Sequence, residues 1–94
     1  MIRHIVLWEL LDPAQAPEFA RILRTCAGLV EGMRRYEVTI RGDDPVSTCD
    51  VALVSEFDDA AALQAYLDHP VHRDAGRQLG PMRRGKHVLD AIVD

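Results

Sequence analysis

Residues 2–11, IRHIVLWELL, are rich in β-branched and aromatic side chains and therefore predict a strand. One face of this strand would present the even-numbered residues, such as Val6 and Trp8, and the other the odd-numbered residues, such as Leu7. Both faces are largely apolar, and a strand of this kind is covered on both sides in a folded protein. We therefore expect apolar side chains from other elements, or from a second chain, to pack against each face of this strand.

The remaining segments alternate between strand and helix signals, with aspartates and prolines before the helices and glycines after them. The predicted elements are strand 2–11, a helix from Asp12 to Gly32, strands 35–41 and 51–57, a helix capped by Asp58 and Asp59 and running to Leu67, a short helix from Pro70 to Gly80, and strand 86–93. This order predicts an α+β fold of the ferredoxin-like βαββαβ type, with a four-stranded antiparallel sheet and helices packed on one face. We expect a single domain over residues 1–94.

Helices on one face leave the other face of such a sheet open. We expect that open face to hold Val6, Trp8, Tyr36, Val38, Ile40, Leu53 and Leu89. Soluble monomers seldom expose an apolar patch of that size. The sequence therefore predicts a twofold homodimer, sheet facing sheet, which closes a dimeric α/β barrel around an apolar cavity.

Charge and cysteine content exclude several classes of partner. The chain has 15 acidic and 11 basic residues, and it lacks a basic cluster of the kind that binds nucleic acid or anionic membranes. We interpret residues 83–86, RRGK, as a polar turn before the last strand.

No apolar run is long enough to span a bilayer, and the first strand lacks the cleavage site of a signal peptide. Cys26 and Cys49 are isolated thiols, which favours a cytoplasmic protein.

Residues 65–74, AYLDHPVHRD, combine a tyrosine with two histidines. Pro70 disfavours helical geometry at His69, so one helix should end here and another begin. His72 would then lie in the first turn of the second helix, where the helix dipole disfavours an imidazolium. A neutral imidazole at that place can act as a general base. The alternative is that His72 is a surface residue with no chemical role.

The other histidines allow more than one interpretation. His4 lies on an apolar strand face, so it is either a core residue with a satisfied hydrogen bond or a polar group in an apolar ligand pocket. His69 and His72 are spaced like metal ligands, but Pro70 breaks the helix that would aim both at one ion. We therefore expect no metal site. Motifs for nucleotide or flavin binding are absent, and we expect no cofactor.

Three stretches, MIRHIVLWEL, CDVALVSEFDD and LQAYLDHPVH, occur in the order and at the spacing seen in the stress-responsive A/B barrel domain family, which the chain resembles over nearly its whole length. This resemblance implies a dimeric α/β barrel. A more distant resemblance is to olivetolic acid cyclase of plants, an enzyme of that family that closes a linear polyketide by aldol condensation without a cofactor.

The resemblance to the cyclase implies a role for three residues. His72 matches the general base, Tyr66 matches the tyrosine that supports it, and His4 matches a first-strand histidine that lines the site. A further histidine of the cyclase aligns with Val51, so that part of the site is missing here. The apolar walls of the pocket are expected to be Val6, Trp8, Val38, Leu53 and Phe57.

Two functions are compatible with this sequence, and so is a purely structural dimer. The first is cofactor-free acid–base catalysis of the cyclase or aldol type on a small aromatic or polyketide-like carbonyl compound, with His72 as the base. The second is a small-molecule-binding or stress-response protein that uses the same cavity without turnover. The sequence does not decide whether the protein is an enzyme.

Overall fold

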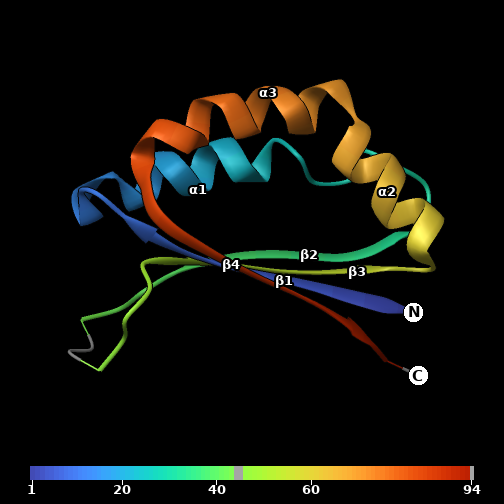
Figure 1. The fold of residues 1–94 in the computed structure, drawn as a ribbon, viewed down its shortest axis with the longest axis horizontal. Helices are drawn as coiled ribbons and strands as arrows, with labels where there is room; N and C mark the ends of the chain where they lie inside the picture. Colours follow the sequence, from blue (N-terminus) through green and yellow to red (C-terminus); the bar gives the residue numbers. More distant parts are fainter. Residues whose placement is uncertain (44–45, 94) are drawn as a thin grey trace.

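A four-stranded antiparallel sheet carries the helices on one of its faces in the computed structural model, which describes residues 1–43 and 46–93 (Figure 1). The elements are β1 (Ile2–Leu10), the 3-10 helix η1 (Pro13–Gln15), α1 (Ala16–Arg24), β2 (Met33–Ile40), β3 (Val51–Phe57), α2 (Ala60–Asp68), α3 (Pro70–Leu79), the 3-10 helix η2 (Gly80–Met82) and β4 (Arg83–Ile92). The strand order is β2-β3-β1-β4. The predicted ferredoxin-like α+β arrangement is confirmed.

Side-chain caps determine where the helices begin. Asp12 accepts a hydrogen bond from the amide two residues later (3.0 Å), and Asp59 accepts one from the amide three residues later (2.8 Å). His69 ends α2 and caps α3, because its Nδ1 accepts a hydrogen bond from the Val71 amide at 3.1 Å. Asp58, which was expected to share the cap of α2, instead pairs with the Arg34 guanidinium. The predicted junction at the HPVH sequence is therefore present.

Two predicted boundaries are wrong. The first helix ends at Arg24 rather than at Gly32, and the chain then turns through Gly28, which has a φ of 70°. Gly32 instead begins the approach to β2: its φ is 90°, and a Cβ there would lie 2.9 Å from the Cβ of Ala62. The last strand begins at Arg83, so residues 83–86 are part of the sheet and not a turn before it.

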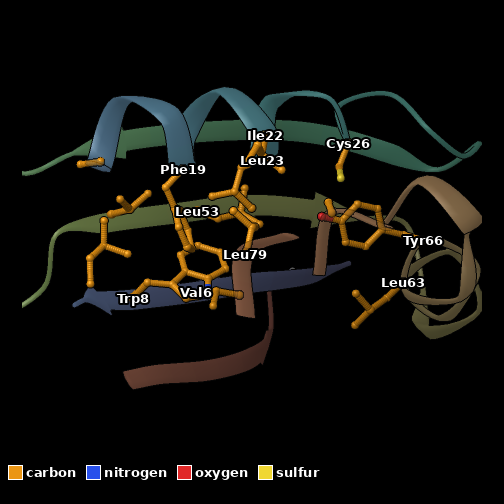
Figure 2. Close-up of a cluster of buried hydrophobic side chains, with 14 of the residues drawn as sticks. Val6, Trp8, Phe19, Ile22, Leu23, Cys26, Leu53, Leu63, Tyr66 and Leu79 are labelled. Atoms are coloured by element: carbon orange, nitrogen blue, oxygen red, sulfur yellow. The ribbon is translucent and has the colours of Figure 1, made fainter. Parts of the chain in front are cut away.

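The helix-facing side of the sheet holds the even-numbered residues of β1. Val6 and Trp8 are buried there, and the Trp8 ring packs edge-on against Phe19 of α1 with the centroids 5.2 Å apart (Figure 2). The antiparallel register brings Leu53 opposite Val6, on the same side. Several residues predicted on the open face are therefore on the helix-facing side: Val6, Trp8, Tyr36, Val38, Ile40 and Leu53. Of the residues in that prediction, only Leu89 lies on the open face, where it is 59% exposed.

The open face is nevertheless apolar at its centre. It presents Ile5 and Leu7 of β1, Val54 of β3 and Leu89 of β4, which the register places on one side of the sheet. Leu7 is 37% exposed although it lies on a central strand. The uncovered apolar face thus exists, but it consists of different residues from those predicted. No helix in the described part of the chain is long and apolar enough to cross a membrane.

Candidate functional site

A cavity of about 240 Å³ lies between the helix-facing side of the sheet and the helices. Its lining residues with polar groups suited to catalysis or binding are His4, Tyr66, His72, Lys86 and Asp90. Apolar walls come from all layers of the fold, including Val6, Trp8, Leu53 and Val88 from the sheet. A hollow of about 300 Å³ near residues 47–52 is larger, but neither histidine nor tyrosine lines it among the described residues.

The residues assigned from the sequence are distributed unevenly around this cavity. His4, Tyr66 and His72 all line it, and so do Val6, Trp8 and Leu53. Val38 and Phe57 are not among its lining residues. Phe57 is fully buried and contacts the Tyr66 ring, with the ring centroids 5.2 Å apart. The expectation of a cavity between two facing sheets is wrong for these residues, because the even-numbered side of β1 faces the helices of its own chain.

His72 is held by the junction between the two C-terminal helices. Its Nδ1 donates a hydrogen bond to the carbonyl oxygen of Leu67 at 3.1 Å. A carbonyl can only accept, so the proton of the neutral ring is on Nδ1 and the lone pair is on Nε2. Burial lowers the pKa of His72 below its ordinary value, and the charge of Lys86 lowers it further. His72 therefore has the protonation state that a general base needs near neutral pH.

His4 is oriented by a carboxylate across the sheet. The two residues are partners in the β1–β4 register, and His4 Nδ1 lies 2.5 Å from Asp90 Oδ1. The ring donates from Nδ1 to the carboxylate, which leaves Nε2 as the second functional nitrogen. The His4 side chain is only 7% exposed, whereas that of Asp90 is 45% exposed. His4 is thus both a satisfied residue of the core and a lining residue of the cavity.

Tyr66 contacts His72 through its ring, with the centroids 4.6 Å apart. Its hydroxyl lies 3.3 Å from the hydroxyl of Tyr36, which in turn donates to the carbonyl oxygen of Leu23 at 2.7 Å. Since the Tyr36 proton is used for that carbonyl, Tyr66 is the donor of the pair. Burial raises the pKa of Tyr66 to about 12, so the phenol is neutral at physiological pH.

Sequence reasoning missed Tyr36, Lys86 and Asp90 as neighbours of the site. The alternation along β4 puts Lys86 and Asp90 on the face opposite to Leu89, which was the one residue of this strand expected to face the cavity. The pairing of Asp90 with His4 depends on the register between the first and last strands. The alternation of side chains along β4 could therefore have indicated Lys86 and Asp90, if the side of the sheet that faces the helices had been known.

Within residues 1–43 and 46–93, no three His, Cys, Asp or Glu side chains lie close enough together to hold a metal ion. His69 uses its Nδ1 as the cap of α3. The two histidines of the HPVH sequence thus have separate local roles.

Comparison with known proteins gives one family match. A family model described as "Stress responsive A/B Barrel Domain" matches residues 2–93. A protein of Streptomyces coelicolor, described as uncharacterized, is 38% identical over 79 residues, which cover 78% of this chain and 80% of that protein.

Solved structures show the same fold. A dimeric protein of unknown function with a ferredoxin-like fold from Bacteroides fragilis matches with a TM-score of 0.84 at 26% identity, over 98% of this chain and 95% of that one. A hydroxynitrile lyase from Passiflora edulis matches with a TM-score of 0.79 at 18% identity, over 99% of this chain and 93% of that one. At that identity the lyase shows a shared fold only.

Proposed function

Because the chain belongs to the stress-responsive A/B barrel domain family, we propose that residues 1–94 form one such domain, which pairs as a homodimer and binds a small aromatic or polyketide-like carbonyl compound. The binding site is the cavity between the sheet and the helices of each protomer. His72 acts there as a general base in a cofactor-free reaction of the cyclase or aldol type.

The observation that carries this proposal is that His4, Tyr66 and His72, from β1, α2 and α3, all line one cavity. The cavity has mainly apolar walls and a small number of convergent polar groups, which is the usual composition of a small-molecule site. Its volume of about 240 Å³ is below the range of roughly 300–1,000 Å³ for drug-sized ligands. A compound of about one ring therefore fits better than a long polyketide chain.

The proposed reaction begins with a proton transfer to His72. Nε2 takes a proton from the carbon next to a carbonyl group. The electron pair of the broken C–H bond forms the C=C bond of an enolate, and the π pair of the carbonyl moves to its oxygen. The enolate carbon then attacks a second carbonyl carbon, and the new alkoxide takes the proton back from His72. His4, held by Asp90, orients the substrate through Nε2. The exclusion of water by the apolar walls strengthens each of these polar contacts.

The homodimer rests on the open face of the sheet. Leu7 and Leu89 lie there with Ile5 and Val54, and a second copy of the same face is the natural cover for such a patch. The B. fragilis protein is described as dimeric, which supports the same assembly here. Cys26 and Cys49 are both free thiols, in keeping with the cytoplasm as the proposed compartment.

Exchange of the methyl protons of acetophenone in D₂O tests the role of His72. Each transfer to Nε2 followed by return of a deuteron labels the methyl group, and NMR follows the labelling directly. We expect the protein to accelerate exchange and the substitution His72→Phe to remove the acceleration. The control is His69→Asn, because His69 is not among the cavity-lining residues and an asparagine side chain can keep the cap of α3. Equal loss in both variants, or no acceleration by the wild type, would refute His72 as the base.

A second candidate function is binding without turnover in the same cavity. The specific observation in its favour is that the Tyr66 hydroxyl donates to Tyr36 and not to His72. In addition, Val51 is 2% exposed and occupies the place where the cyclase has a further histidine. Saturable quenching of Trp8 fluorescence by acetophenone, without any proton exchange, would establish this second function in place of the first.

A further inference from the structure

We infer that the compound bound in this cavity carries a carboxylate group, and that Lys86 and Arg83 hold this carboxylate at the rim. The inference deepens the proposed function and rests on it, since it assumes that the cavity takes a small molecule. Beyond the proposed function, it states that the ligand is an anion and names the two residues that select the anion.

Lys86 and Arg83 line two hollows that share part of their walls. Lys86 lines the main cavity together with His72 and Trp8. The same three residues also line an adjoining hollow of about 140 Å³, which extends along α3 as far as Arg83. Lys86 is exposed overall, yet burial of part of its side chain lowers its pKa, so the side chain lies partly in solvent and partly along the cavity wall. A ligand in contact with His72 can therefore reach both cations.

A β-bulge brings the two cations to the same side of the sheet. Lys86 is opposite Trp8 and Gly85 is opposite Glu9, but the next partner pair along β1 is Leu10 with Arg83. Arg84 is the extra residue. In a regular strand, residues three apart point to opposite faces, so Arg83 would lie away from the helices. Bulges commonly re-aim a side chain beside a functional site.

Neither cation is neutralised by the protein within the described residues. Most arginines of the described chain pair with a carboxylate; Arg84, for example, lies 3.4 Å from Glu9. No ion pair joins Arg83 or Lys86 to any carboxylate in residues 1–43 and 46–93. Among the described residues that line the two hollows, Asp90 is the only acidic one, and its carboxylate is hydrogen-bonded to His4. This is a local site of positive charge on a chain whose net charge is -4.

The surroundings of Lys86 disfavour its charged form. Burial lowers the pKa of Lys86, and the positive charge of Arg83 lowers it further. A carboxylate placed between the two groups would favour the ammonium form and offset the repulsion. Lys86 and His72 both line the two hollows, so a ligand anchored at Lys86 would lie next to the base. The two cations thus act as positioning residues for the carbon that loses its proton.

Binding of matched acids and amides tests the inference. Benzoate and benzamide have nearly the same shape and differ in charge, as do phenylacetate and phenylacetamide. Trp8 is the single tryptophan of the chain and lines both hollows, so its fluorescence reports occupancy. We would measure Kd for all four compounds with the wild-type protein and with Lys86→Met, Arg83→Met and Arg84→Met. Arg84→Met is the matched control, because it removes one positive charge next to the site without touching the hollow.

We expect each acid to bind about tenfold more tightly than its amide in the wild type, as for a charge-assisted hydrogen bond. Lys86→Met and Arg83→Met should each reduce that preference, while Arg84→Met should keep it. Equal binding of acid and amide in the wild type would overturn the inference and leave the proposed ligand cavity intact. Preference lost equally in Arg84→Met would also overturn it, because net charge would then explain the result. If none of the compounds bound, the cavity function and the inference would both fail.

Discussion

His4 and Asp90 are joined across the β1–β4 pair, with Nδ1 of the imidazole 2.5 Å from Oδ1 of the carboxylate. The contact links the beginning of the chain to its end and sets which nitrogen of His4 can face a ligand. It also satisfies a histidine that is buried among apolar residues. One hydrogen bond therefore serves both the stability of the sheet and the geometry of the cavity.

Asp90→Asn should lower the free energy of unfolding by about 1 kcal/mol, because the buried His4 imidazole loses a charged hydrogen-bond acceptor. The loss stays this small because the Asp90 side chain is partly exposed to solvent. Urea denaturation at neutral pH measures this. The control is Asp68→Asn, which breaks a surface ion pair with Arg73 and should change the same quantity by less than about 0.5 kcal/mol. Equal effects of the two substitutions would contradict a structural role for the His4–Asp90 contact.

The protonation of His72 should follow its burial. Its folded-state pKa is lowered below the ordinary value of about 6.5, so below that value the unfolded chain binds more protons than the folded one. Stability should therefore rise with pH through the lowered pKa and level off above about 6.5. NMR titration of the His72 ring gives the midpoint directly. A wild-type midpoint at or above the ordinary value would contradict the account. In the variant Lys86→Met the midpoint should move upward, because the positive charge of Lys86 is removed.

The two tyrosines should respond differently to loss of their hydroxyl groups. Tyr36→Phe leaves the Tyr66 hydroxyl buried without its acceptor, which should cost about 1–3 kcal/mol of unfolding free energy. Tyr66→Phe leaves Tyr36 bonded to the carbonyl of Leu23 and should cost less. Urea denaturation of both variants measures the order. A larger loss for Tyr66→Phe would show that its hydroxyl has another partner.

The open face of the sheet should control assembly. Leu7→Lys places a charge at the centre of that face and should convert the dimer to a monomer, because a buried unpaired ammonium is costly in a facing pair of sheets. Analytical ultracentrifugation measures the mass. Leu11→Lys is the control, since Leu11 is 57% exposed and lies beyond the end of β1. A monomeric wild type, or a dimeric Leu7→Lys variant, would contradict the homodimer.

Much of the fold could be predicted from local signals. The alternation of residues 51–57, the caps Asp12 and Asp59 and the break at Pro70 each indicated an element that is present. The side of the sheet that the helices cover could not be predicted, because β1 is apolar on both faces. That choice depends on packing against α1, as in the contact of Trp8 with Phe19.

The candidate site divides in the same way. His4, Tyr66 and His72 could be singled out by residue type and by resemblance to a family. Asp90 and Lys86 could not, because their places depend on the register of β4 against β1. The bulge at Arg84 is likewise invisible in a sequence, since it is a mismatch between two strands far apart in the chain. Non-local pairing therefore limits what the sequence alone reveals of the chemistry.

The most direct test of the central claim is an NMR titration of the histidine rings with acetophenone. The account predicts that the resonances of His4 and His72 shift together with one Kd, because both rings line the same cavity, while those of His87 on the opposite face stay unchanged. Shifts confined to one of the two rings, or shifts of all three alike, would contradict a shared ligand site.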